Sequence, residues 1–269
     1  MTPGLLTSGL AAGSGGVVGV ILGLVGGGGS ILAVPLLTYV VGLGSPHAAI
    51  GTSALAVSVS AAGNLVPQWR AGTVKWRCAA VFSAAGVLGA LVGSAGAKAI
   101  DGQSLLALFG VVMLVVGGLM LRKRRGNDDP EVRLTRNSAP ELLPWLLGIG
   151  LAVGLFSGFF GIGGGFLIVP GLMLATSMPL PMAIGTSLVA VSAFGAATAA
   201  SYAASGLIDW PVAGLFTLGG VLGGLVGAGL GRRLSQHKRA FALIFAGLVI
   251  LVGLYVVARG VLPLLGAAT

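Results

Sequence analysis

The stretch Gly26-Gly27-Gly28-Gly29-Ser30 lies between a long apolar run and a short one, residues 31–41, which contains Pro35. The same arrangement recurs at Gly161-Ile162-Gly163-Gly164-Gly165, with Pro170 five residues after it. The two prolines are 135 positions apart. A glycine cluster between apolar runs is typical of a membrane helix that is interrupted where the backbone itself is needed. We therefore predict that each cluster breaks a helix and that the two breaks form a binding site.

The composition indicates the class of protein. Of the 269 residues, 56% are hydrophobic and 8% are charged, and the mean hydropathy is +1.04. Such a chain has too few polar groups to cover a soluble surface, so we predict a helical integral membrane protein. The 49 glycines lie within apolar runs, where small residues let helices approach closely. The single cysteine, Cys78, excludes an intramolecular disulfide and a cysteine-built metal site, and we expect neither metal nor cofactor.

The apolar segments determine the number of membrane crossings. Two of them, 30–43 and 165–176, directly follow the glycine clusters and are short. Each is either a thin, tilted span or one arm of a re-entrant hairpin with the glycine cluster at its tip. Eight others are long enough to span, since about 20 residues cross the hydrocarbon core. These eight cover about residues 5–25, 47–67, 78–97, 103–121, 142–160, 181–205, 211–231 and 240–258.

The chain consists of two similar halves. A polar linker, residues 122–141, separates a first membrane repeat at 1–121 from a second at 142–269. The block Ala49-Ile50-Gly51-Thr52-Ser53 is identical to Ala183-Ile184-Gly185-Thr186-Ser187, which lies 134 positions later. We predict an internal duplication in which each half holds one glycine-tipped, broken-helix hairpin and three transmembrane helices.

The basic residues indicate the orientation in the membrane. Thirteen of the 15 Lys and Arg residues fall in three segments, 70–77, 122–136 and 232–239. Positive charge gathers on cytoplasmic loops, and placing all three segments there requires an even number of crossings between the linker and the last segment. Each half then has an odd number of crossings. The predicted fold class is therefore an all-α polytopic membrane protein of two inverted repeats, with both termini on the outer face.

The chemistry of the two breaks favours an anion. No Asp or Glu lies within an apolar segment, so no carboxylate cage for a cation is available. Helices that begin near Ser30 and Gly165 offer free backbone N–H groups with partial positive charge, and glycines let an anion approach them. Hydroxyls of the duplicated block complete a neutral site that is rich in donors. The predicted substrate-binding residues are Gly27, Gly28, Gly29, Ser30, Thr52, Ser53, Gly163, Gly164, Gly165, Thr186 and Ser187.

Each of these features also has a purely structural interpretation. The glycine clusters could serve only to pack helices, which is the role we assign to Gly89 with Gly93 and to Gly227 with Gly231. Thr and Ser in membrane helices often bond their own i−4 carbonyl or cap a helix, and those bonds need no ligand. His47, near the predicted outer face, is either a proton-coupling group, since histidine exchanges protons near neutral pH, or an interfacial side chain.

The sequence lacks the residues that an enzyme would need. It contains no His-x-x-x-His and no Cys-x-x-Cys, its apolar segments hold no paired carboxylates, and the first glycine cluster lacks the Gly-Lys-Ser/Thr ending of a phosphate-binding loop. The inter-helical loops account for the net charge of +9, so no nucleic acid is expected as a partner. The expected partners are a small anion and the lipid bilayer, and a homodimer is compatible with the sequence. The rivals to a carrier are a passive anion channel and a structural subunit of a larger complex.

The duplicated glycine clusters with their prolines, the two Ala-Ile-Gly-Thr-Ser blocks and the glycine-rich helix in each half resemble the sulfite exporter TauE/SafE family. The resemblance covers residues 17–233, nearly the whole chain. It implies a secondary transporter in the bacterial inner membrane that moves a small sulfur-containing anion, such as sulfite, thiosulfate or an organosulfonate.

Overall fold

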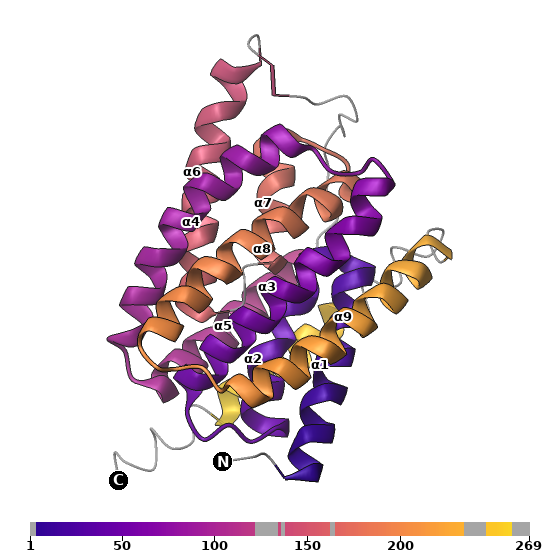
Figure 1. The fold of residues 1–269 in the computed structure, drawn as a ribbon. Coiled ribbons are helices and arrows are strands. Elements are labelled where there is room, and N and C mark those ends of the chain that lie inside the picture. The colour runs from indigo at the N-terminus through magenta and orange to yellow at the C-terminus, as the bar shows by residue number, and fades with distance from the viewer. Residues whose placement is uncertain (1–3, 122–133, 136–137, 162–164, 234–245, 260–269) are drawn as a thin grey trace.

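The computed structural model describes residues 4–121, 134–135, 138–161, 165–233 and 246–259, which form one bundle of helices (Figure 1). All regular secondary structure in these ranges is helical, which confirms the predicted all-α class. Large apolar side chains such as Trp145, Leu222 and Leu251 are exposed on the outside of the bundle. A lateral surface that is covered by lipid is expected to look like this.

The first half contains a long helix, an irregular helical segment and three further long helices. The elements are α1 (Leu5–Val25), the 3₁₀ helix η1 (Gly26–Leu32), the short α2 (Ala33–Pro35), the π-helical turn η2 (Leu36–Val40), α3 (Pro46–Arg70), α4 (Trp76–Lys98) and α5 (Gly102–Leu121). The change from α1 to η1 coincides with the four glycines, because glycine loses the most backbone freedom in an α-helix and favours it least. Pro46 begins α3, a position where its missing N–H costs nothing.

The second half has a similar order of long and short helices. Its elements are α6 (Ala139–Phe160), α7 (Gly165–Thr176), α8 (Leu180–Ala204), α9 (Trp210–Arg233) and a further helix, Ala246–Arg259. Helix α6 ends at Gly161, whose φ of 64° is a left-handed conformation that glycine adopts without strain. The second glycine cluster therefore ends a helix where the sequence predicts a break.

Six helices of the described chain are long and apolar enough to cross a membrane, as expected for a multi-pass membrane protein. They are Leu6–Leu24, Pro46–Arg70, Trp76–Lys98, Ala139–Phe160, Leu180–Ala204 and Trp210–Leu230. The two remaining predicted long spans, 103–121 and 240–258, correspond to the shorter apolar helices Gly102–Gly118 and Ala246–Arg259 within the described residues. The total of eight long spans therefore stays a prediction.

Two helix pairs pack most closely, α1 with α9 and α4 with α6. Successive glycines of α1 face successive residues of α9, so the two helices run parallel: Gly15 meets Phe216, Gly19 meets Gly220 and Gly23 meets Gly224. A Cβ atom at any of these three α1 glycines would collide with the backbone of α9. Lipid tails are as apolar as the side chains, so close backbone packing rather than hydrophobic burial holds such helices together.

The α4–α6 pair repeats this arrangement. Gly154 of α6 lies against Gly86 of α4, and Gly154 is equivalent to Gly19 under the offset of 135. Gly89 and Gly93 pack on the backbone of α6, and Gly227 packs on the backbone of α1. This confirms the packing role that the sequence suggested for these three glycines.

Helices α3 and α8 pack against each other at the contact between the two halves. Ser58 of α3 and Ser192 of α8 occupy equivalent positions, 134 residues apart, and they meet directly. The Ser58 hydroxyl donates a 2.7 Å hydrogen bond to the Ser192 carbonyl oxygen. The two duplicated blocks lie on these same helices, about two turns before the paired serines.

Candidate functional site

Helices α6 and α7 form a hairpin around the second glycine cluster. Gly171, in the middle of α7, lies against Ile149 and Val153 of α6, because a Cβ atom there would be 3.2 Å from a methyl group of each. Helix α7 therefore runs back along α6. Its 12 residues reach about 18 Å, well short of the ~30 Å hydrocarbon core, so α7 does not span by itself. Most residues of α7 are buried, including Gly165 and Phe166 at its start, whereas Pro170 and Leu174 are exposed, so one side of the inner arm packs against protein.

The first glycine cluster also turns the chain back on itself. Gly29 of η1 lies against the backbone of Ile21 and Leu22 in α1, where any Cβ atom would collide with it. Residues 28–35 are all buried. The packing explanation thus holds for Gly29, and ligand binding by the cluster stays a prediction.

The tips of the two hairpins lie close to each other and to the opposite half. Segment η1 packs against both α7 and α8. At the second tip, Gly161 lies against Ile50 of α3. The Ser53 hydroxyl of α3 donates to the carbonyl oxygens of Gly161 at 3.0 Å and Ile50 at 2.9 Å. A helix of the first half therefore holds the hairpin tip of the second half.

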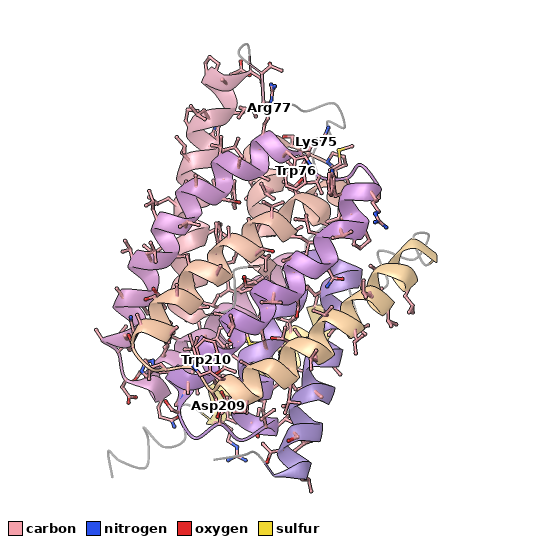
Figure 2. All side chains as sticks on the ribbon, viewed as in Figure 1. Lys75, Trp76, Arg77, Asp209 and Trp210 are labelled. Carbon is pink, nitrogen blue, oxygen red and sulfur yellow. The ribbon has the colours of Figure 1, made fainter. Side chains whose placement is uncertain are left out.

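The two threonines of the duplicated blocks make equivalent contacts across the halves. The Thr52 hydroxyl oxygen accepts a 3.1 Å hydrogen bond from the backbone N–H of Asp209, just before α9. The Thr186 hydroxyl oxygen accepts a 3.0 Å bond from the backbone N–H of Lys75, just before α4. We call these two bonds the threonine clasps. They lie at opposite ends of the bundle, as the labelled Lys75 and Asp209 show (Figure 2).

The glycines of the two blocks explain how the clasps form. A Cβ atom on Gly51 would collide with the carbonyl oxygen of Leu207, and one on Gly185 would collide with the Thr73 hydroxyl. Each block therefore needs its glycine for a loop of the other half to come within hydrogen-bonding distance of the threonine. The clasps were missed in the sequence analysis, although Trp76 and Trp210, directly after the two loops, share the offset of 134 and were a usable signal.

Only some of the predicted site residues are found buried where the two halves of the chain contact each other. Within the described chain the buried ones are Gly28, Gly29, Ser30, Thr52, Ser53, Gly165, Thr186 and Ser187. Gly27 lies in η1, and Gly163 and Gly164 lie outside the described residues. Ser187 donates to the Ile184 carbonyl oxygen at 2.8 Å, within its own helix. The four hydroxyls of the duplicated blocks thus make protein contacts, and their role toward an anion stays a prediction.

His47 lies on the first turn of α3, two residues before the duplicated block begins. Its side chain is partly buried, and its Nδ1 has no hydrogen-bond partner within the described residues. Proton coupling through His47 remains a prediction.

Several buried hydroxyls near the hairpins have no partner in the described chain, and the sequence analysis did not single them out. Ser157 lies one turn before the second tip, and Thr38 lies in the return arm of the first hairpin. Thr198 of α8 and Ser83 of α4 are further examples. Such groups are free to donate to a ligand or to water, and buried, partnerless serines and threonines can be recognised only once the packing is known.

The acidic residues of the described chain lie at helix ends. Asp101 accepts from the backbone N–H groups of Gln103 and Ser104 at the start of α5, and Asp209 accepts from the N–H of Val212 in α9. Glu141 is exposed in the first turn of α6. No group of three or more His, Cys, Asp or Glu side chains that could hold a metal ion occurs in the part of the chain that the structure describes.

Comparison with known proteins identifies the family. Residues 11–256 match the family described as sulfite exporter TauE/SafE. A "Probable membrane transporter protein" of Xylella fastidiosa (strain Temecula1) is 50% identical over 247 residues, which are 92% of this chain and 94% of the relative. The "Probable membrane transporter protein YunE" of Bacillus subtilis is 25% identical over 262 residues, 91% of this chain and 95% of the relative. No solved structure matches. The chain therefore belongs to the sulfite exporter TauE/SafE family and is a membrane transporter of that type.

Proposed function

We propose that this chain is a secondary transporter that moves a small sulfur-containing anion, such as sulfite, thiosulfate or an organosulfonate, across the bacterial inner membrane. The anion is held by backbone N–H groups at the glycine-rich tips of the two hairpins, where the halves of the chain meet. One observation carries this proposal. The Ser53 hydroxyl of the first half donates a hydrogen bond to the carbonyl oxygen of Gly161 at the tip of the second hairpin. A ligand bound at this tip would therefore contact a segment whose position depends on both halves.

The distribution of charge supports an anion over a cation. The acidic side chains at positions 101, 141 and 209 lie at helix ends, where the two aspartates already cap backbone N–H groups. The buried polar side chains beside the tips are hydroxyls, which are neutral and can donate hydrogen bonds. Helix N-termini add partial positive charge. A cation would find no charged ligand in such a site.

The paired contacts support two inverted repeats as the moving parts. Equivalent loops, 71–75 and 205–209, lie at opposite ends of the bundle (Figure 2). The loop with Lys75 is basic, which favours the cytoplasm for that end and the outside for the end with Asp209, where α1 begins (Figure 1). Transporters of inverted repeats alternate access by moving one repeat against the other around a fixed site. In this mechanism, opening either end would break the threonine clasp at that end.

Counterflow in proteoliposomes tests the function. Vesicles containing the purified protein are loaded with unlabelled sulfite, thiosulfate, sulfoacetate or chloride, and uptake of ³⁵S-labelled thiosulfate or sulfite is measured. A carrier gives saturable uptake that is accelerated by its own substrate inside. A channel gives conductance without this acceleration, and a structural subunit gives neither. Movement of K⁺ but of no oxyanion would contradict the proposal.

A matched pair of variants tests the proposed position of the site. Gly165→Asp places a negative charge at the start of α7, and Gly165→Asn places a neutral side chain of nearly the same size there. Both variants strain the buried tip equally, but only the aspartate repels an anion. We expect Gly165→Asp to reduce uptake well beyond Gly165→Asn at equal folded yield. Equal uptake by the two variants would show that the anion does not approach α7.

A further inference from the structure

A groove of about 380 Å³ lies between the end of α3 and α9. Gly63, Val66 and Pro67 of α3 form one wall, and Leu225 of α9 forms the other. Arg70 and Ala71 close it at the end where α3 terminates. The groove is more than ten times the ~30 Å³ share of a water molecule in the liquid, so it accommodates part of a larger molecule.

The walls of the groove open toward the membrane. Val66 is 45% exposed and Leu225 is 51% exposed, and the neighbouring α9 side chains Leu222 and Val226 are exposed as well. In a protein whose lateral surface is surrounded by lipid, such apolar side chains are covered by acyl chains. A lipid chain can therefore enter the groove sideways, without first passing through water.

The mouth of the groove carries the positive charge of Arg70. Arg70 is exposed, and no Asp or Glu occurs in α3, in loop 71–75 or in α9. Trp69 and Trp76 lie beside it, 60% and 44% exposed, with their rings in edge-to-face contact at 6.0 Å. Exposed tryptophans next to arginine are typical of the level of the lipid headgroups. The planar guanidinium forms paired hydrogen bonds with phosphate, for which it is well suited.

The equivalent region of the second half is built differently. Arg70 corresponds to Ala204, and Pro67 corresponds to Ser201. There Lys98 donates to the Ser201 hydroxyl at 3.0 Å and to the Ser201 carbonyl oxygen at 3.1 Å, so its ammonium group is engaged by α8. At the first of these two equivalent places an exposed arginine thus lies beside an apolar groove, whereas at the second the nearby cation is hydrogen-bonded to α8.

We propose that this groove binds an anionic phospholipid, with the lipid phosphate on Arg70 and an acyl chain along Val66, Pro67 and Leu225. The occupant is a lipid rather than a free anion because most of the lining is apolar and faces the bilayer. With the Arg70 end in the cytoplasm, as proposed above, the lipid comes from the anionic cytoplasmic leaflet. Binding there would join α3 to α9, and so one half of the transporter to the other.

Native mass spectrometry and thermal unfolding of the full chain in detergent test the proposal. The probes are phosphatidylglycerol, phosphatidylcholine with the same acyl chains, and inorganic phosphate. We expect phosphatidylglycerol to be retained and to raise the unfolding temperature, whereas the other two probes have little effect. The same stabilisation by phosphatidylcholine or by inorganic phosphate would overturn the proposal, because it would indicate an unspecific lipid effect or a free-anion site.

The matched variants are Arg70→Gln and Arg77→Gln. Both remove one positive charge from the same end of the bundle, and Arg77 does not line the groove. We expect Arg70→Gln to weaken phosphatidylglycerol binding about fivefold, which corresponds to about 1 kcal/mol, the contribution of one basic residue at an anionic membrane surface. Arg77→Gln should leave the binding almost unchanged. Because Arg70 is exposed, its variant should fold like the wild type without added lipid. Equal retention of phosphatidylglycerol by the two variants would overturn the proposal.

Discussion

Loops 71–75 and 205–209 have the same backbone shape and opposite charge. Gly72 has a φ of 69° and Gly206 a φ of 68°, and the residue that ends each loop donates its N–H to a threonine of the other half. That last residue is Lys75 in one loop and Asp209 in the other, at opposite ends of the bundle. The duplication conserves the contacts that hold the halves together. The charge of the partly buried residue that ends each loop instead differs between the two ends of the bundle.

The largest expected loss of stability comes from substitutions at the glycine contacts that recur in the two equivalent helix pairs, α4–α6 and α1–α9. Gly154→Val would place a side chain on the backbone of Gly86 and push α4 and α6 apart. Overpacking a core typically costs 1–3 kcal/mol, and a backbone collision that side chains cannot relieve should cost about 3 kcal/mol or more. We expect folded protein to be largely lost, as measured by size-exclusion chromatography of detergent extracts. Gly19→Val, the equivalent change in α1, should behave in the same way.

The control is Gly148→Val on the exposed face of the same helix, where a Cβ atom meets nothing within 4 Å. Its equivalent, Gly13→Val in α1, has the same open surroundings. Both controls should retain folded protein. Loss of folded protein in Gly154→Val but not in Gly19→Val would show that the two helix pairs are not equivalent.

The threonine clasps should contribute less to the free energy of unfolding than the glycine contacts. Thr52→Val and Thr186→Val keep the shape of the side chain but leave the N–H of Asp209 or Lys75 without its acceptor. An unsatisfied buried donor costs about 1–3 kcal/mol, and these N–H groups are only partly buried, so we expect about 1 kcal/mol for each variant. Thr→Ser at either position keeps the hydroxyl and should recover most of the loss. Thermal unfolding measures this difference, and equal stability of the Val and Ser variants would exclude a structural role for the clasps.

The same variants separate the clasp from an anion site. If Thr186 only holds Lys75, transport by Thr186→Val should fall in proportion to the folded protein. A loss of anion binding in folded Thr186→Val protein would show that the hydroxyl also contacts the substrate.

Substitution of the loop glycines should lower the stability by an amount similar to the loss of one clasp. Gly72→Ala and Gly206→Ala force an alanine into a left-handed conformation, which costs about 1 kcal/mol, and neither Cβ atom meets a neighbour within 4 Å. Asparagine tolerates this conformation better, so Gly→Asn should cost less than Gly→Ala at both positions. The two loops should give the same loss in thermal unfolding. Clearly different losses would indicate that only one loop keeps its shape in the membrane.

Much of the helical architecture could be predicted from the sequence. The short segment predicted at 165–176 is α7 with the same limits, and the spans predicted at 78–97 and 181–205 end within two residues of α4 and α8. Long apolar runs bounded by glycine, proline or charge have well-defined ends, because a buried backbone in lipid must be helical.

The first hairpin could be predicted less well. The sequence suggested a short helix over 30–43 like the second one, whereas the chain forms 3₁₀ turns to Leu32 and a π-helical turn over Leu36–Val40. Apolar residues at every position carry no periodicity that distinguishes these helix types. The hydrogen-bond partners of Thr52 and Thr186 could not be predicted from the sequence either, because each bond joins residues more than 100 positions apart. Only the relative orientation of the two halves brings them together.

Accessibility of the two equivalent loops tests the inversion of the halves most directly. In a Cys78→Ala background, Ala71→Cys and Ser205→Cys place single thiols at exposed positions that are equivalent under the offset of 134. The native Cys78 is only 1% exposed and should itself stay unlabelled from either side. A membrane-impermeant maleimide should label the Ser205→Cys protein in intact spheroplasts and the Ala71→Cys protein only in inverted vesicles. Labelling of both positions from the same side would contradict inverted repeats and the transport mechanism that depends on them.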